Sequence, residues 1–457
     1  MDSSTATPAT PEKKPGFLIN RNFALLWSGQ SISNVGDFVF DTTLILWIAT
    51  IIAGGQTWAP LAVSGVLVAT AVPIFLIGPI AGVFVDRWNK RQTMLAMDAT
   101  RAILIALLLP VALGKPSIFW QLGAIYTIVF LASACAQFFN PARFTLIGDI
   151  VEEPYRARAS GLSQTTLNLA KIIGPPIAAP LLFTFGVEWA LMVNSLSFVV
   201  SFLAILAVRV SQSTRNAAAT QHDSFFQDFS AGIRFFVRNH VLVAILISII
   251  LVVLGLGCID AVGVFFVTQN LHVSADLFGF MAAAVGAGAV VGAILASMFA
   301  SRLGEARIFW LGLIAAGVVI LLLARMTNFA LGVACFALAG LVIAPVNVAV
   351  GPLVLHVTPR EFVGRVIAVI DPLQALTSIL SISLAGTLAS TLLSGFHTTI
   401  LNIAFGPIDT IFTGTGILTI LGGLYAMRSL RGVTLGKAAA SAPEAVPAAE
   451  AQTAIDP

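Results

Sequence analysis

Twelve predominantly apolar stretches follow one another along the chain, each long enough to cross a membrane as a helix. A helix needs roughly 20 mainly apolar residues to span the hydrocarbon core of a bilayer. Cut at their polar, proline or glycine breaks, the stretches predict helices over approximately residues 23–53, 60–84, 93–113, 118–139, 161–184, 188–208, 241–268, 277–300, 307–325, 330–352, 365–393 and 408–428. The pattern therefore predicts an all-α membrane protein with twelve transmembrane helices.

The longest polar break, residues 210–239, separates six helices from six. Its first part is rich in Ser, Thr, Ala and Gln, which is typical of a flexible linker. Its second part places Phe225, Phe229 and Phe236 on one side of a helix, a pattern typical of a helix that lies in the membrane interface. We predict a disordered tail over 1–16, a six-helix half over 17–209, this linker over 210–239, a second half over 240–430 and a disordered tail over 431–457.

An internal repeat relates the two halves. The pattern Gly82-x-x-x-Asp86-Arg87 returns as Ser297-x-x-x-Ser301-Arg302, and Asp41 has a counterpart in Asp260. The second copy has lost the carboxylate of Asp86, so the halves are related but not equivalent. Two six-helix halves in parallel repeat, with a binding site between them near the membrane midplane, are typical of secondary transporters.

Composition excludes a water-soluble protein. Hydrophobic residues make up 58% of the chain and charged residues 10%, against about 45–50% and about 25% in soluble domains. The three cysteines lie inside apolar stretches and the five histidines have no metal-ligand spacing. Phosphate-binding and zinc-protease motifs are absent from the sequence. We therefore expect no metal site, no cofactor, no nucleic-acid partner and no enzymatic activity.

The positive charges fix an expected orientation. With the N-terminus on the inner side, 20 of the 24 Lys and Arg residues fall on that side, while Lys115 and Arg325 fall on the outer side. Cytoplasmic segments of membrane proteins carry this excess. We therefore expect both termini in the cytoplasm and the chain in a prokaryotic cytoplasmic membrane.

The stretch Gly82–Arg91 concentrates charge between two apolar helices. It holds Arg87, Lys90 and Arg91 against Asp86, which predicts a short aqueous turn on the cytoplasmic side. Asp86 is suited to accept from the free backbone donors at the start of the eleventh helix, near Arg365, where the helix dipole favours an anion. The alternative is that these charges only set the topology.

These residues resemble the major facilitator superfamily over about residues 17–430. Gly82–Arg91 is similar to the superfamily pattern G-x-x-x-D-R-x-x-[RK]-[RK], with Asn89 where a glycine is usual. Asn140-Pro141-Ala142 and neighbouring motifs resemble the branch with macrolide-efflux and enterobactin-exporter proteins. The resemblance implies the twelve-helix fold and a gating role for Gly82, Asp86, Arg87, Lys90 and Arg91. A segment similar to the antiporter motif, with alanines replacing three glycines, includes Ala170, Gly174, Pro175 and Ala178.

Ionisable residues inside the predicted helices are the candidates for chemistry. Asp37 and Asp41 lie four residues apart and so share one face of the first helix, which makes them candidates to carry an exchanged proton. The alternative is a packing role. Asp260 either completes an acidic patch or caps a bend. Lys171 is expected to pair with an inward carboxylate.

Further polar residues leave two interpretations open. Asp98 and Arg101 are expected to form an inner charge cluster with Gly82–Arg91. Six amide side chains either line the transport path or form hydrogen bonds between helices: Gln30, Asn34, Gln137, Asn168, Asn347 and Gln374.

The sequence as a whole favours a proton-coupled antiporter that exports amphipathic drugs, macrolide-like compounds or lipophilic cations, by alternating access. The alternative within transport is export of an endogenous product such as a siderophore, for which Lys171 is the best support. A channel is a further possibility that saturable counterflow would separate from a carrier. We expect a monomer in the lipid bilayer whose partners are protons and a small-molecule substrate.

Overall fold

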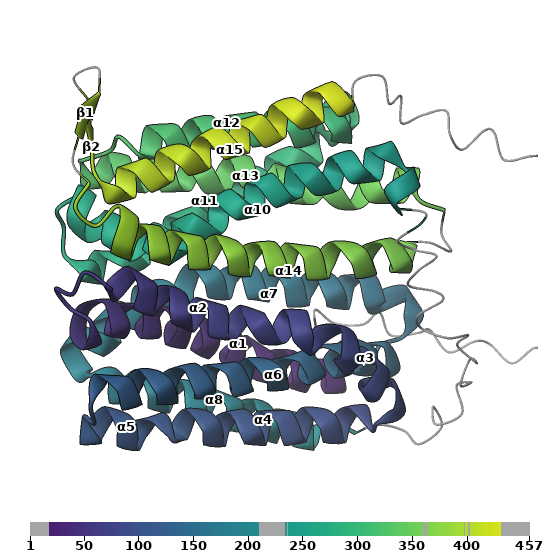
Figure 1. The fold of residues 1–457 in the computed structure, drawn as a ribbon. Coiled ribbons are helices and arrows are strands. Elements are labelled where there is room, and N and C mark those ends of the chain that lie inside the picture. Colours follow the sequence, from purple (N-terminus) through teal and green to yellow (C-terminus); the bar gives the residue numbers. More distant parts are fainter. Residues whose placement is uncertain are drawn as a thin grey trace, which may run out of the picture.

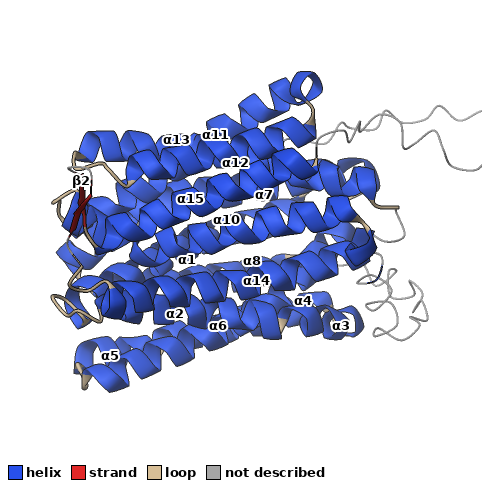
Figure 2. Cartoon of the chain, turned by 45° about the horizontal axis from the view of Figure 1, so that its top comes forward, coloured by secondary structure: helices blue, strands red, loops and turns tan. Residues whose placement is uncertain are grey.

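The computed structural model describes residues 18–209, 234, 236–359, 363–396, 398–400 and 403–430. Twelve of its helices are long and apolar enough to cross a membrane, which confirms the predicted all-α fold. Figure 1 shows them side by side along one common direction. Figure 2 shows that almost all of the described chain is helical. Most of the predicted interfacial helix at 224–238 lies outside the described residues.

The first six spans contain the following elements: α1 (Arg21–Trp47) with the π-turn η1 (Ile48–Ile52), α2 (Ala59–Leu76), α3 (Gly78–Arg87), α4 (Lys90–Ala106), α5 (Leu108–Gly114), α6 (Ile118–Ile150), α7 (Glu153–Pro180) with the π-turn η2 (Leu181–Phe185), and α8 (Val187–Ala207). Helices α2 and α3 follow each other directly and are separated by a break at Ile77. Pro73, which lies inside α2, has no backbone N–H to donate and weakens the helix before this break.

The last six spans contain α10 (His240–Phe265) with the π-turn η4 (Phe266–Asn270), the turn η5 (Ala275–Leu277), α11 (Phe278–Leu303), α12 (Glu305–Leu323), α13 (Phe329–Val357), α14 (Val363–Thr387) with the π-turn η7 (Leu388–Leu392), and α15 (Pro407–Ser429). A short antiparallel hairpin, β1 (Thr398–Ile400) and β2 (Ile403–Phe405), precedes α15. We call the end where α1 begins and α15 ends the inner end, and the end with the hairpin the outer end (Figure 1).

Local sequence sets several helix starts. Asparagines stand directly before four helices, and each side-chain oxygen accepts from a backbone N–H of the first turn: Asn20, Asn89, Asn239 and Asn328. Such caps satisfy donors that the helix itself leaves unpaired. Asn89, which replaces the usual glycine of the charged stretch, therefore has a structural role as the cap of α4.

The repeat is visible in how the helices end. The first and fifth spans of each group finish in a five-residue π-turn at the outer end, as η1 and η2 in one group and η4 and η7 in the other. Turns of this kind are rare. Their recurrence at matching places supports the parallel repeat that the sequence indicates.

Two pairs of helices join the two groups. Helix α2 packs on α14, and α7 packs on α11. The contact is close, because a Cβ at Gly286 of α11 would lie 2.6 Å from Ile172 of α7. On the other pair, the backbone N–H of Leu61 donates to Ser390 Oγ at 3.0 Å.

Among the described residues, the apolar core is continuous across the two groups at the outer end and not at the inner end. One cluster there combines Leu44 and Val63 from the first group with Phe265, Phe266 and Ala385 from the second. At the inner end the clusters stay within one group, around Phe23 and Met94 or around Phe309 and Leu353. The two groups are therefore packed together at the outer end and separate at the inner end.

Candidate transport site

Asp41 and Asp260 occupy matching positions in the two groups. Asp41 lies twenty residues after the start of α1, and Asp260 lies twenty residues after the start of α10. Each is surrounded by protein and still has an exposed side chain. A residue that lines a cavity inside the protein is both enclosed by protein and accessible in this way. The pairing predicted from the repeat thus recurs in the three-dimensional structure.

Asp37 lies one turn before Asp41 in different surroundings. It is half-buried, and the polar groups that act on its carboxyl group are Arg101 and Asp98 of α4 and Asn194 of α8. Asp37 in turn acts electrostatically on Asp41. The two carboxylates therefore interact as predicted, but only Asp41 is exposed, and Asp37 belongs to the interior of the first helix group.

A chain of buried polar side chains crosses this interior. Arg143 of α6 donates to Gln30 Oε1 of α1 at 3.4 Å, and Gln30 Nε2 donates to Ser201 Oγ of α8 at 2.7 Å. Ser201 Oγ donates to Asp98 Oδ2 at 2.6 Å, and Asp98 Oδ1 pairs with Arg101 Nη2. Four helices are linked in this way through groups that hydrocarbon does not solvate.

Arg101 is held between two aromatic rings, with its guanidinium 4.4 Å from the centre of Phe139 and 4.3 Å from the centre of Phe198. Asp98 and Arg101 thus find their partners inside the helix group. The prediction that they cluster with Gly82–Arg91 is not what the structure shows, because Asp98 faces Ser201 rather than the charged turn. The sequence does not determine which face of α4 packs against α8, and that packing gives Asp98 its partner.

Lys171 is exposed on α7, and its ammonium lies 6.0 Å from the centre of the Phe38 ring. Within the described residues the pair Asp98–Arg101 is the one salt bridge, so the predicted ion pair of Lys171 with a carboxylate is absent from this conformation. Contact with an aromatic face replaces it.

The segment similar to the antiporter motif lies between helices. Ala170, Gly174, Pro175 and Ala178 are all buried. A Cβ at Gly174 would lie 2.5 Å from the Cβ of Phe38, so the small residue lets α7 approach α1 closely. Pro175 contacts α11 through its carbonyl group, opposite Gly279. The motif therefore joins α1 and α11 through α7.

The charged stretch is more helical than predicted. Instead of a turn from Gly82 to Arg91, α3 continues to Arg87, and α4 begins at Lys90, which leaves only Trp88 and Asn89 between them. A helical backbone needs no water to satisfy its hydrogen bonds, so the charges extend from helix ends. Gly82 has no neighbour that a Cβ would meet within 4 Å.

Two cations of this stretch stabilise helix ends. Lys90 Nζ donates to the carbonyl of Val85 at 2.9 Å and also to that of Asp86, at the end of α3. Arg91 donates to the carbonyls of Ile205 and Leu206, at the end of α8. Cations at such ends satisfy unpaired carbonyls and interact favourably with the helix dipole. The sequence offered no sign of the contact with α8, which lies more than a hundred residues away.

Asp86 and Arg87 are exposed at the inner end. The proposed partner of Asp86 is the start of α14, where residues 360–362 and the side chain of Arg365 lie outside the described residues. The contact of Asp86 with the eleventh helix remains a prediction.

The sequence pattern did not identify Asp371 or the polar face of α8 as candidates. Asp371 is exposed in the span Val369–Leu392, and its place inside an apolar stretch was the signal that could have identified it. Asn194, Ser197 and Ser201 are buried and repeat at helical spacing on α8, which indicates a polar helix face.

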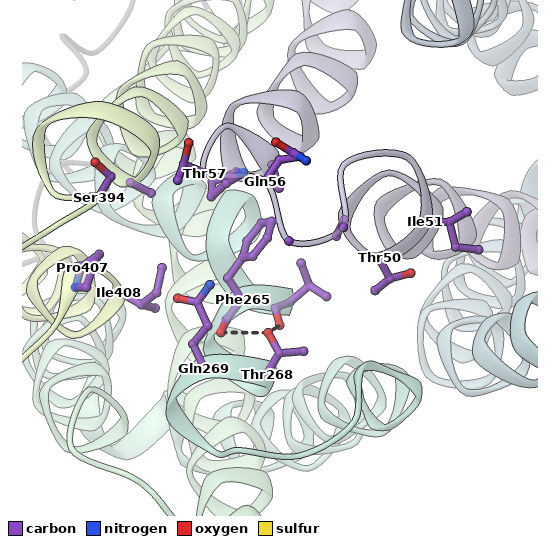
Figure 3. A pocket seen from close by; sticks show the side chains of 17 residues that line it. Thr50, Ile51, Gln56, Thr57, Phe265, Thr268, Gln269, Ser394, Pro407 and Ile408 are labelled. Carbon is purple, nitrogen blue, oxygen red and sulfur yellow. Dashed lines mark hydrogen bonds between the residues drawn. The ribbon is translucent and has the colours of Figure 1, made fainter. Parts of the chain in front are cut away.

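A pocket of about 570 Å³ lies between the groups at the outer end (Figure 3). Its polar side chains come from the α1–α2 connection, from η4 and from the segment after η7, and include Thr50, Gln56, Gln269 and Ser394. In Figure 3 the hydroxyl of Thr268 donates to the carbonyl of Phe265 at 3.3 Å. The apolar outer cluster, which contains Phe265, lies between this pocket and the level of Asp260.

The chain is similar to known bacterial transporters. It is 23% identical to the uncharacterized MFS-type transporter YkuC of Bacillus subtilis over 88% of this chain and 90% of that protein. It is 24% identical to the multidrug efflux pump Tap of Mycobacterium tuberculosis over 75% and 81%. It is 21% identical to macrolide efflux protein A of Streptococcus pyogenes over 80% and 89%.

Among solved structures, a D-xylose-proton symporter covers 89% of this chain and 96% of its own, with a TM-score of 0.66 at 13% identity, which shows a shared fold. The family model described as "Transmembrane secretion effector" matches residues 16–400. Its match covers most of the helices described above, including α1, α7 and α10. The chain therefore belongs to the transmembrane secretion effector family and is a transporter of the major facilitator superfamily.

Proposed function

We propose that this protein is a proton-coupled antiporter that exports amphipathic drugs by alternating access. The observation that carries the proposal is the pair Asp41 and Asp260, exposed at equal depth in the first helix of each group. Carboxylates inside membrane helices are costly and mark proton or substrate pathways. Two of them, one on each moving half, are placed to respond to a proton and to a cationic substrate.

The charge of the site favours lipophilic cations and neutral compounds. Asp41 and Asp260 are exposed carboxylates on the two groups, with Asp37 one turn from Asp41, and Lys171 is an exposed cation on α7. Arg101, the cation that acts on Asp37, pairs with Asp98 inside the first group. Lys171 lies against an aromatic ring, which leaves the carboxylates available to a positively charged substrate. An anionic product such as a siderophore would meet mostly repulsion here.

The packing supports a state open toward the cytoplasm. The outer cluster joins both groups, while the inner clusters do not. With the inner end in the cytoplasm, as the excess of Lys and Arg on that side predicts, the site loads from inside. Export then requires the outer cluster to open toward the pocket of Figure 3.

The named relatives support the direction and the location. Tap is a multidrug efflux pump and macrolide efflux protein A is an efflux protein, and both are bacterial. We place this chain in the cytoplasmic membrane of a bacterium, with both termini in the cytoplasm and one chain as the working unit.

Transport by reconstituted protein tests the proposal. Ethidium or a macrolide is added outside liposomes that have an imposed pH gradient. Its uptake into the liposomes is compared for wild type, Asp41→Asn and Asp260→Asn. We expect gradient-driven transport to fall at least tenfold in both variants, while exchange of substrate without a gradient persists. Saturable counterflow in the wild type would separate a carrier from a channel.

Asp276→Asn is the matched control, because Asp276 is an exposed carboxylate in the turn η5, beyond the end of α10. It should transport like the wild type. Wild-type gradient dependence in both Asp41→Asn and Asp260→Asn would refute the proton-coupling role of these residues.

A further inference from the structure

A cavity of about 230 Å³ lies within the second helix group. Its walls come from α10, α12, α13, α14 and α15. Among its lining residues Phe309, Leu313 and Thr419 are buried, whereas Asn347 is exposed. The cavity is therefore lined by buried side chains of the helix group and by an exposed amide.

The two amides of the cavity lie within the membrane-spanning length of their helices. Asn347 is ten residues from the inner end of α13, and Gln374 is eleven residues from the inner end of α14. At ~1.5 Å per residue both lie about 15 Å from those ends. Both amides therefore lie well inside membrane-spanning helices rather than at their ends.

The two amides at this level have no hydrogen-bond partner among the described residues. Each offers two N–H donors and one acceptor oxygen. A polar group on an apolar wall costs free energy unless it finds a partner. Both amides line the cavity and are therefore free to bond to a molecule that enters it.

The lining also limits the chemistry of that ligand. The described residues around the cavity are apolar except for Asn347, Gln374 and Thr419, and none is ionisable. The volume exceeds the ~150 Å³ that accommodates a benzene molecule and is below the ~300–1,000 Å³ typical of pockets for whole drug-sized ligands. An uncharged part of a larger molecule fits these limits.

Asp260 lies one turn beyond Leu256 on α10, and Leu256 lines the cavity. Residues four apart on a helix share a face. A molecule whose apolar body occupies the cavity therefore has Asp260 within reach of a group that projects toward the outer end.

We propose that this cavity binds the uncharged apolar body of the exported compound, a unit of one or two rings, with Asn347 and Gln374 bonding to its hydroxyl, carbonyl or amine substituents. The inference rests on the proposed export function and adds the substrate class. Compounds with such a body and either no charge or one positive charge at a distance from it are the expected substrates.

Binding of an uncharged probe tests this proposal separately from proton coupling. N-phenyl-1-naphthylamine, an aromatic amine that fluoresces in apolar surroundings, is titrated into the full-length protein in lipid nanodiscs, with empty nanodiscs subtracted. Ala316→Phe and Val253→Phe fill the cavity from two different helices, α12 and α10. We expect either variant to weaken probe binding at least tenfold.

Replacement of the amides isolates the hydrogen bonds. Asn347→Leu and Gln374→Met keep the side-chain size and should each weaken binding several-fold. Gly123→Phe is the control for the two cavity-filling variants, because it adds a Phe outside the cavity, where a Cβ at Gly123 of α6 meets nothing within 4 Å. Asp276→Asn, at an exposed carboxylate in η5, should leave binding of the uncharged probe unchanged. Probe binding is measured without a pH gradient, so failure of proton coupling and failure of this site give different results.

Wild-type probe affinity in both cavity-filling variants would overturn the proposal. So would native mass spectrometry that finds a phospholipid held by the wild type and lost from Ala316→Phe, because a lipid chain would then be the occupant. Melting temperatures of all variants identify any that fail to fold, and the second filling variant then decides the outcome.

Discussion

Asp98 shows how a single ionised residue is accommodated inside a membrane helix. Its side chain is fully buried, pairs with Arg101 and accepts from Ser201. A buried charge is tolerated when a partner and hydrogen bonds offset the loss of hydration. Two nearby donors, Arg101 Nε and Asn194 Nδ2, are buried without an acceptor among the described residues, and Asp37 is the carboxylate beside them.

Removing one member of this pair should destabilise the protein strongly. Asp98→Asn leaves the guanidinium of Arg101 buried and unpaired, which costs about 3–5 kcal/mol. We expect a large decrease in the melting temperature of the detergent-solubilised protein. The double variant Asp98→Asn with Arg101→Gln should recover much of the loss.

Glu152→Gln is the control for this experiment, because Glu152 is exposed between α6 and α7. Its melting temperature should match the wild type. If Asp98→Asn melted at the same temperature as this control, the ion pair would have no role in stability.

At the scale of elements, the contact of α7 with α11 controls how closely the two groups approach. Gly279 faces the backbone of Pro175, which cannot move aside as a side chain can. Gly286 and Ile172 repeat the close approach two turns further along. The sequence contained Gly174 and Pro175 as a motif, but it gave no partner for them.

Gly279→Ala should therefore weaken closure of the outer end. The added methyl group meets the carbonyl of Pro175 and pushes α11 away. We expect faster labelling of a cysteine placed at Ala385, which is buried in the outer cluster, by an impermeant maleimide in a cysteine-free background.

Gly123→Ala provides the comparison, since its methyl group meets no neighbour and helix propensity favours Ala by about 0.5–1 kcal/mol. Labelling at Ala385 should not change in this variant. Equal labelling in Gly279→Ala and Gly123→Ala would mean that the contact of α7 with α11 does not limit opening.

At the scale of the whole molecule, the two helix groups share a structural repeat but differ in the polar residues of their interiors. Both begin with a helix that carries an aspartate twenty residues in and ends in a π-turn. The first group contains the buried Asp98–Arg101 pair, and the second contains the cavity of about 230 Å³ lined by Asn347 and Gln374. Both groups thus carry a proposed coupling carboxylate, and the second group also carries the proposed substrate cavity.

The orientation of the whole molecule is testable with two exposed positions that flank one helix. Ser117 precedes α6 at the outer end, and Glu152 follows it at the inner end. In intact cells, Ser117→Cys should react with an impermeant maleimide, and Glu152→Cys should react only after permeabilisation, both in a cysteine-free background. The opposite result would reverse the orientation and with it the proposed direction of transport.

Much of this architecture was predictable from the sequence. The number of spans, the break after the sixth span and the matching of Asp41 with Asp260 depend on composition and spacing along one chain. These features can be read from one stretch of sequence at a time, because in a membrane each helix must satisfy its own backbone hydrogen bonds.

Only the tertiary structure decided which neighbours the polar residues have. Asp37 and Asp41 share a helix face in sequence, yet one joins the interior of its helix group and the other is exposed. Lys171 lies on an aromatic ring, and Arg91 caps a helix more than a hundred residues away. A helix that is apolar on all sides carries no pattern that identifies its neighbours. Packing between helices therefore assigns each charge its partner, and packing alone places the amides of Asn347 and Gln374 on one cavity.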